Sequence, residues 1–175
     1  MKIGIYGGTF NPPHLGHLAA ARTALDALKL DKLILMPAAV PPHKVLPENS
    51  PAQEHRLAMV ERMADAMERP GAVEVSTLEL EREGKSYTSD TLEAIHRQYP
   101  EAELWLLMGT DMFLTLHLWH EPGTILRLAG ICAFGRSEQD GEDVFAPQRE
   151  FLSKTYPDAR IATITLPGLV DISST

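Results

Sequence analysis

Cysteine is nearly absent from this 175-residue chain. Cys132 is the only one, which excludes an intrachain disulfide and a thiolate metal cluster. Positive charge is also scarce: 16 Lys and Arg residues against 24 Asp and Glu give a formal net charge of -8. This balance argues against a broad nucleic-acid surface, which would need a basic patch. No apolar run reaches the length of a membrane span, and the N-terminus carries no basic leader, so we expect no membrane association and a cytoplasmic location.

What is present has an ordinary globular composition, with 44% hydrophobic and 23% charged residues. A chain of this length can bury a core of its own, so we expect a single domain over residues 1–175. Short apolar runs alternate with longer stretches of helical spacing, which is typical of parallel strands crossed over by helices. The sequence therefore predicts an α/β fold, Rossmann-like, with an open, mostly parallel sheet and helices on both faces.

The strands are expected at residues 2–6, 32–36, 73–76, 103–108, 130–134 and 161–166. Cys132 falls inside the fifth of them, as a buried side chain. Helices are expected at residues 15–28, 52–67, 89–99 and 148–156. Residues 37–51 and 135–147 break the periodicity and are interpreted as long loops.

The most informative segment is GGTFNPPHLGH, residues 7–17, between the first expected strand and the first expected helix. Gly7 and Gly8 permit a sharp turn and close approach of a ligand at the carboxyl end of the strand. The helix start offers unpaired N–H groups and a partial positive charge for a phosphate. His14 and His17 share one face if the helix begins near residue 13. A helix-capping loop that happens to contain histidines is the alternative, but the ordered combination favours phosphate chemistry.

The segment lacks G-x-G-x-x-G and the Lys-Ser/Thr ending of a P-loop, which argues against a dehydrogenase and a P-loop kinase. It resembles the signature of the nucleotidyltransferase superfamily, whose members carry H-x-G-H or T-x-G-H after the first strand. The resemblance implies a nucleoside triphosphate bound over this turn, with His14 and His17 stabilising charge in the transition state. Nucleotidyl transfer needs positioning and electrostatic stabilisation rather than a protein nucleophile, which agrees with these residue types.

Further motifs narrow the choice of the substrate that accepts the nucleotidyl group. The runs PPHK (41–44), SYTSDTL (86–92) and GTD (109–111), together with Trp119, resemble the bacterial nicotinate mononucleotide adenylyltransferases along the whole chain. The resemblance implies adenylyl transfer from ATP to nicotinate mononucleotide, giving nicotinate adenine dinucleotide and pyrophosphate in NAD biosynthesis. Two alternatives stay open: another adenylyltransferase of the superfamily, acting on nicotinamide mononucleotide or phosphopantetheine, and a nucleotide-binding sensor without turnover.

The resemblance also implies roles for individual residues. The expected catalytic residues are His14, His17 and Lys44. The expected ATP-binding residues are Gly7, Gly8, Thr9, Phe10, His14, His17, Gly109, Asp111, Arg136, Ser173, Ser174 and Thr175. Of these, Arg136 is expected from its position after the fifth strand, at the carboxyl edge of the sheet, rather than from the resemblance. The expected nicotinate mononucleotide-binding residues are Asn11, Lys44, Thr88 and Trp119.

Most of these side chains have a structural interpretation as well. Lys44 and Arg136 could be solvated surface cations, and Trp119 could belong to the core. Helix capping could account for Asp111, and for Ser86 or Thr88.

We expect no metal held by the protein, because His117 and His120 alone have a ligand-like spacing and no third ligand accompanies them. Mg²⁺ is expected with ATP, held mainly by phosphates and water. The remaining expected partners are the two small-molecule substrates, with self-association into a homo-oligomer left open. The chain ends at Ser173-Ser174-Thr175, inside what the resemblance identifies as I-S-S-T-x-[IL]-R. The arginine and the last helices of the family are absent, which predicts a domain truncated within this motif.

Overall fold

The computed structural model describes residues 1–8, 10, 15–38, 53–82, 87–135 and 142–165. Six strands lie in these residues: β1 (Lys2–Gly8), β2 (Lys32–Pro37), β3 (Val73–Val75), β4 (Glu103–Gly109), β5 (Ala129–Gly135) and β6 (Ile161–Thr165). Each coincides with an expected strand to within one or two residues. Most are rich in Ile, Leu or Val, and β1, β2, β4 and β5 are buried along most of their length, which suits parallel strands covered on both faces.

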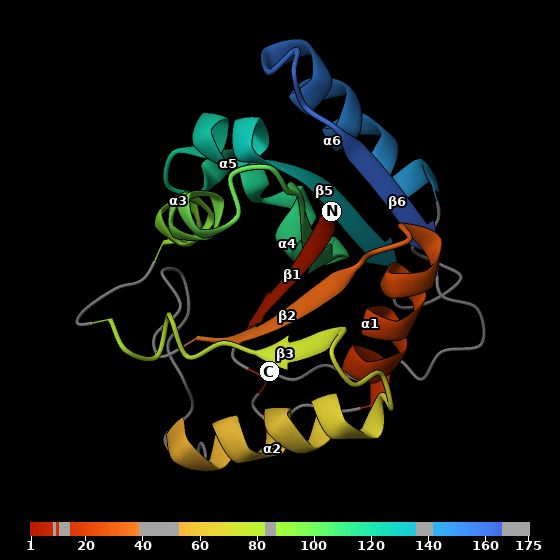
Figure 1. Ribbon diagram of the computed structural model, residues 1–175. Coiled ribbons are helices and arrows are strands. Elements are labelled where there is room, and N and C mark those ends of the chain that lie inside the picture. Colours follow the sequence, from red (N-terminus) through yellow and green to blue (C-terminus); the bar gives the residue numbers. More distant parts are fainter. Residues whose placement is uncertain (9, 11–14, 39–52, 83–86, 136–141, 166–175) are drawn as a thin grey trace.

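The six strands form one sheet in the order β3-β2-β1-β4-β5-β6, and every pair is parallel (Figure 1). The predicted Rossmann-like α/β architecture is therefore confirmed. From β1 the chain first moves outward through β2 and β3, then returns to β4 and moves outward on the other side. This reversal makes the space between the carboxyl ends of β1 and β4 the topological switch point, where ligands of open α/β sheets bind.

Helices cover both faces of the sheet (Figure 1). Their bounds are α1 (Leu15–Ala27), α2 (Gln53–Ala66), α3 (Thr88–Gln98), α4 (Thr110–Leu114), α5 (Pro122–Leu128) and α6 (Glu142–Thr155), with a 3-10 turn η1 at Leu116–Leu118. Helices α1 and α2 pack on one face over Tyr6, Leu33 and Leu35. Helices α3 to α6 pack on the other face over Ile3 and Ile5. Alternate residues of β1 thus face two separate cores, as the period of a strand requires.

Two expectations about helices need correction. The loop expected at residues 135–147 ends early, because α6 begins at Glu142 and contains Pro147. Phe145 is buried against Phe113, and this packing outweighs the hydrogen bond that proline removes from the first turns. Helices α4 and α5 were not predicted, since each is shorter than the periodic pattern that reveals a helix. The other long loop, 37–51, lies outside the described residues except for Pro37, which ends β2, and Ala38.

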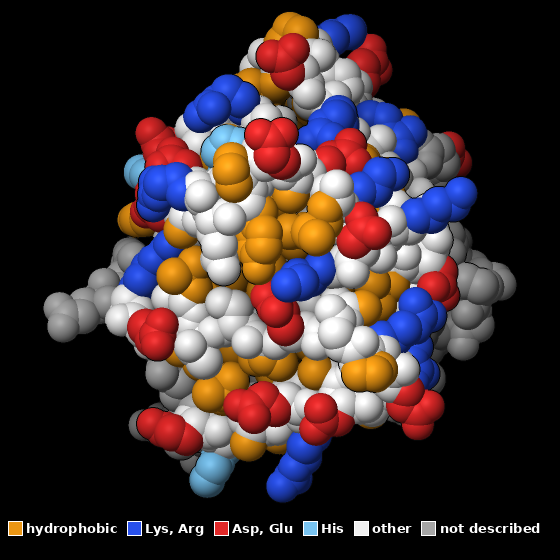
Figure 2. Space-filling model, in the orientation of Figure 1, with side chains coloured by type: hydrophobic (Ala, Val, Ile, Leu, Met, Phe, Trp, Pro, Cys, Tyr) orange, Lys and Arg blue, Asp and Glu red, His pale blue; other side chains and the backbone are white. Residues whose placement is uncertain are grey.

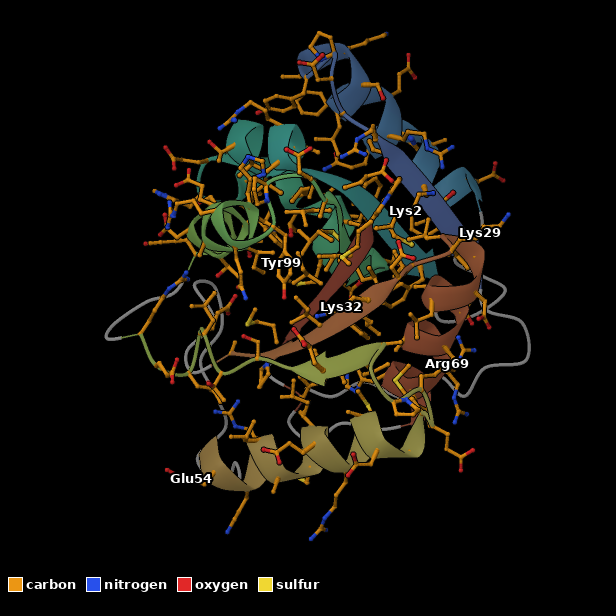
Figure 3. All side chains as sticks on the ribbon, viewed as in Figure 1. Lys2, Lys29, Lys32, Glu54, Arg69 and Tyr99 are labelled. Atoms are coloured by element: carbon orange, nitrogen blue, oxygen red, sulfur yellow. The ribbon has the colours of Figure 1, made fainter. Side chains whose placement is uncertain are left out.

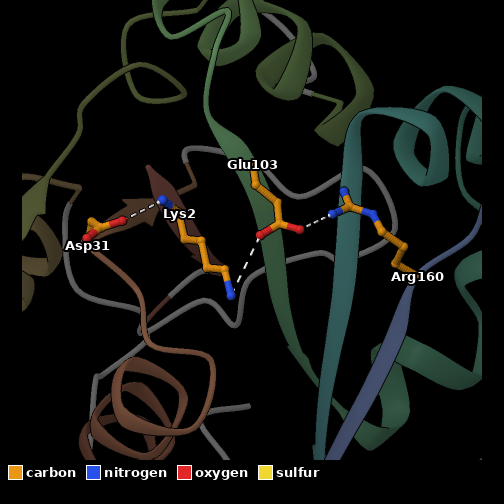
Figure 4. Close-up of polar contacts among 4 residues, drawn as sticks. All are labelled: Lys2, Asp31, Glu103 and Arg160. Carbon is orange, nitrogen blue, oxygen red and sulfur yellow. Dashed lines mark hydrogen bonds and ion pairs between the residues drawn. The ribbon is translucent and has the colours of Figure 1, made fainter.

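Charged side chains join the strands at the amino edge of the sheet, the edge opposite the switch point. Glu103 lies between Lys2 and Arg160, with Nζ of Lys2 at 3.9 Å and an Arg160 guanidinium nitrogen at 2.7 Å (Figure 4). The backbone N–H of Lys2 also donates to the Asp31 carboxylate at 2.7 Å. On β2, Lys32 (Figure 3) has its Nζ 3.3 Å from Glu74, whose carboxylate raises the pKa of Lys32. This edge is a solvated ion-pair network and is structural in character.

On the face shown in Figure 2, acidic and basic side chains are interspersed around apolar atoms, with no continuous basic surface among the residues described. None of the helices among the described residues is long and apolar enough to cross a membrane.

Candidate active site at the switch point

Glycines end the three central strands at the ligand-binding edge of the sheet. Strand β1 ends at Gly8, its neighbour β4 ends at Gly109, and β5 ends at Gly135. Among the described residues, a Cβ on Gly7 would come 3.7 Å from the Met36 carbonyl oxygen and one on Gly8 would come 3.9 Å from the Phe10 ring. The structure therefore places Gly7, Gly8 and Gly109 beside the switch point, where the sequence predicted a nucleotide.

His17 lies in the first turn of α1 and is held by aromatic rings. Its imidazole centroid is 5.0 Å from that of Phe10 and 6.0 Å from that of Tyr6, both in edge-to-face geometry. Only 8% of the residue is exposed. Tyr6 in turn contacts Phe10 and Phe134, each at 5.5 Å. This aromatic wall, Tyr6, Phe10 and Phe134, restricts the imidazole to a narrow range of orientations at the end of β1.

Phe10 itself has a left-handed backbone conformation, with φ of 46°. Such a conformation is uncommon for a bulky residue and costs free energy that the surroundings must offset. The ring is 99% buried against Tyr6 and His17, and that burial holds the turn in place. Phe10 was expected to contribute to ATP binding. It also has a structural role, because its ring packs against His17.

The residues after β4 connect this strand to β5. Gly109 is the N-cap of α4 and Asp111 is exposed in its first turn, without any side-chain capping bond. Asp111 is therefore not the capping residue of α4. Thr110, which the sequence analysis did not single out, donates its hydroxyl to the Phe134 carbonyl at 3.4 Å. This bond ties together the two strand ends that flank the expected ribose-binding carboxylate.

A second group of residues lies where α3 meets α5. Thr88 is the first residue of α3, and its N-cap is Tyr87, again without a side-chain cap. The indole Nε1 of Trp119 donates to the Thr115 hydroxyl at 3.2 Å, and one side of the ring packs on the core beneath α3 and α5. Trp119 is thus partly core, as one interpretation held, but is not fully buried.

Tyr87 precedes Thr88 and His120 follows Trp119 in the sequence. The rings of Tyr87 and His120 stack on each other, with centroids 4.2 Å apart. The stack brings the start of α3 and the residue after Trp119 together, so Thr88 and Trp119 share one region of the surface. Tyr87 lies inside the SYT run and His120 directly follows Trp119 in the sequence; that position was the available signal for both residues. Glu121, which follows, has a left-handed φ of 49° and is the N-cap of α5.

Eight predicted residues lie outside the described residues: Thr9, Asn11, His14, Lys44, Arg136, Ser173, Ser174 and Thr175. Their roles stay predictions. Within the described ranges, no group of three His, Cys, Asp or Glu side chains could hold a metal ion. His117 and His120 have separate contacts, His117 with the Gln148 amide at 2.9 Å and His120 with Tyr87. Cys132 is fully buried in β5, as expected, and burial raises the pKa of its thiol to about 12.

Comparison with known proteins identifies the family of this chain. The family model described as cytidylyltransferase-like matches residues 5–175. A protein of Gemmatimonas aurantiaca named a probable nicotinate-nucleotide adenylyltransferase is 37% identical over 175 residues, covering 100% of this chain and 78% of the relative. A Trichlorobacter lovleyi protein of the same name is 45% identical over 139 residues, covering 79% of this chain but only 63% of the relative.

Among solved structures, Plasmodium falciparum nicotinic acid mononucleotide adenylyltransferase superposes with a TM-score of 0.76 at 16% identity, covering 99% of this chain and 80% of that one. At this identity the likeness concerns the fold. The chain belongs to the cytidylyltransferase-like family and, within it, to the nicotinate-nucleotide adenylyltransferases.

Proposed function

We propose that this protein transfers the adenylyl group of ATP to nicotinate mononucleotide. In this reaction a phosphate oxygen of the mononucleotide attacks the α-phosphorus of ATP. The new P–O bond forms as the bond from the α-phosphorus to the oxygen bridging to the β-phosphorus breaks, and pyrophosphate leaves. The observation that carries the proposal is His17 in the first turn of α1, beside the glycine turn at the switch point, in a chain of this family.

The turn after β1 would bind the triphosphate. Gly7 and Gly8 allow close approach of the backbone, and the start of α1 offers N–H groups to phosphate oxygens. His17, oriented by Phe10 and Tyr6, would donate to a phosphate oxygen as charge develops there. Because no covalent intermediate is needed, these groups position and stabilise rather than attack. We propose that His14, Lys44 and Arg136, outside the described residues, add cationic or donor groups to the same triphosphate. Thr9 would contribute to the turn, and Ser173, Ser174 and Thr175 would add hydroxyl and N–H donors.

Asp111 and Gly109 would meet the adenosine ribose. The Asp111 carboxylate is exposed at the end of β4 and can accept from ribose hydroxyls. The region of Thr88 and Trp119 would hold nicotinate mononucleotide, with the indole against the pyridine ring and the Thr88 hydroxyl near its carboxylate, and with Asn11 and Lys44 towards the mononucleotide.

Mg²⁺ would accompany ATP, since the ion prefers phosphate and water oxygens. When bound, it would neutralise triphosphate charge. A cytoplasmic location and a homo-oligomer belong to the same proposal and carry none of its chemistry.

The test is magnesium-dependent pyrophosphate release from ATP with three acceptors side by side: nicotinate mononucleotide, nicotinamide mononucleotide and phosphopantetheine. Release with nicotinate mononucleotide is the expected result. Release only with one of the other acceptors would move the protein to that reaction. Tight ATP binding with no release from any acceptor would instead indicate a nucleotide sensor.

His17→Ala tests the mechanism within the same assay. We expect kcat to fall by about 100-fold or more while ATP still binds, because a donor aimed at developing charge acts mainly in the transition state. His96→Ala is the control, since His96 is exposed in the last turn of α3. Unchanged turnover in the His17 variant would remove the imidazole from the mechanism.

A further inference from the structure

Arg56 in α2 is buried, with only 3% of the residue exposed. It is the only Lys, Arg, Asp or Glu side chain of the described residues in the buried class. Arginine is almost never fully buried unless its charge is compensated, because removing a guanidinium from water is costly. Burial accordingly lowers the pKa of Arg56, although a guanidinium keeps its proton at neutral pH. A cost of this kind calls for a specific role.

The contacts of Arg56 lead towards the first turn. A terminal guanidinium nitrogen donates to the Ala38 carbonyl at 2.8 Å. The Ala38 N–H in turn donates to the Gly8 carbonyl, also at 2.8 Å. Ala38 directly follows β2, and the last residue of β2, Pro37, is the register partner of Gly8 on β1. Two hydrogen bonds therefore connect a buried charge on α2 to the glycine that ends β1.

The connection matters because of where each partner lies. The backbones of Leu33 and Leu35 bond towards β3, so Pro37, two residues further on, faces β3 as well, whereas Ala38 faces β1. The Ala38 N–H makes the ladder bond from the end of β2 to the Gly8 carbonyl, and the charge-assisted bond from Arg56 holds the carbonyl of the same residue. Arg56 therefore braces the residue that bonds to Gly8, where β1 ends.

We propose that Arg56 is a positioning residue for the triphosphate: through Ala38 it holds the Gly8 peptide in the geometry that accepts a nucleoside triphosphate at the first turn. The inference rests on the proposed function, since it assumes that this turn binds ATP. Arg56 acts through Ala38 and Gly8 and is not itself assigned a contact with substrate. The acceptor region at Thr88 and Trp119 belongs to the other face of the sheet, so Arg56 should influence the two substrates unequally.

The experiment compares Arg56→Met and Arg56→Lys with Arg62→Met as a matched control, because Arg62 lies on the same helix but is exposed. Binding of α,β-methylene-ATP is measured by calorimetry, which needs no acceptor and no turnover. KM for ATP, KM for nicotinate mononucleotide and the melting temperature are measured in parallel.

We expect Arg56→Met to weaken α,β-methylene-ATP binding and raise KM for ATP by about tenfold or more, with KM for nicotinate mononucleotide within about twofold of the unmodified value. Arg56→Lys should recover part of the loss, since an ammonium can still donate to the Ala38 carbonyl. Arg62→Met should behave like the unmodified protein.

Unchanged binding of α,β-methylene-ATP by folded Arg56→Met would overturn the inference. Equal losses for both substrates together with a lower melting temperature would also overturn it, because they would indicate a general structural role. If Arg56→Met does not fold, Arg56→Lys decides. Faster hydrogen exchange of the Ala38 amide with weaker ATP binding supports the proposal, and unchanged exchange and binding refute it. If the Arg56 variants weaken α,β-methylene-ATP binding but the protein adenylylates no acceptor, the proposed function is refuted and the positioning role of Arg56 is not.

Discussion

Gly130 in β5 leaves room for a ring, and replacing it by alanine gives a sharp stability test. The residue is buried and pairs with Trp105 on the neighbouring strand β4. A Cβ at Gly130 would lie 2.7 Å from the indole Cε3 and Cζ3 and 2.9 Å from Cη2. The ring is rigid, and the Arg160 guanidinium lies 5.4 Å from its centroid. The indole therefore has to tilt as a whole to accept the methyl group.

Overpacking of this kind costs roughly 1–3 kcal/mol. The unfolded chain of the alanine variant is less flexible, which offsets roughly 0.4–1 kcal/mol of that cost. The net loss should be about 1–2 kcal/mol in the free energy of unfolding, and for a chain of this size that lowers Tm by about 4 °C. Gly7→Ala is the control, because a Cβ there would lie 3.7 Å from the Met36 carbonyl oxygen, an ordinary contact distance.

The assay is urea unfolding of four proteins: the unmodified chain, Gly130→Ala, Trp105→Leu and the double variant. If the clash is with the indole, Gly130→Ala should cost almost nothing once Trp105 is leucine, so the cycle should show a coupling of about 1 kcal/mol or more. Equal costs in both backgrounds would mean that the alanine disturbs something other than the ring. In the protein that keeps Trp105, a loss of under about 0.5 kcal/mol in the free energy of unfolding on Gly130→Ala would refute the overpacking argument.

Two further predictions concern titratable groups, the half-buried Glu79 and the fully buried Cys132. Burial raises the pKa of Glu79 above its ordinary value, against the lowering effect of its hydrogen bond from Thr91 and of the Arg82 charge. The folded protein therefore binds this proton more tightly than the unfolded chain, and stability falls as pH rises from about 4.5 through the raised pKa. The free energy of unfolding of Glu79→Gln minus that of the unmodified protein should grow over this range, and a difference that shrinks would contradict the assignment. Cys132, with a thiol pKa of about 12 and no exposure, should react with a thiol reagent at pH 8 at least about 100-fold more slowly in the folded protein than in urea. Rapid stoichiometric labelling of the folded chain would show that β5 opens readily.

The sequence indicates the strands better than the short helices, and the reason is physical. A strand buried on both faces appears as a continuous apolar run, which β1, β2, β4 and β5 all show. Helices α4 and α5 have too few turns to display a period, and the start of α6 is hidden by Pro147. Their existence depends on contacts such as Phe113 with Phe145, which link residues far apart in the chain.

The candidate site divides in the same way. The position of His17 after the glycine turn could be predicted, because strand, turn and helix follow one another locally. The aromatic wall around it could not, since Phe134 comes from a distant strand. Arg56 was missed because an arginine in an amphipathic helix is ordinarily a surface residue, and only the fold reveals that its guanidinium meets Ala38.

The two proposed substrate regions belong to different cores, which has a consequence for how the enzyme can be modified. Tyr6, Phe10 and the residues packing against them belong to the core beneath α1 and α2, whereas Trp119 packs on the core beneath α3 to α6. The sheet separates these cores, and the regions meet only at its carboxyl edge. The free-energy effects of substitutions in contact with one core should therefore add nearly independently to those of substitutions in contact with the other. In the proposed enzyme, the triphosphate contacts around His17 and the pyridine contacts around Trp119 can accordingly be altered separately, because each set of side chains packs on its own side of the sheet.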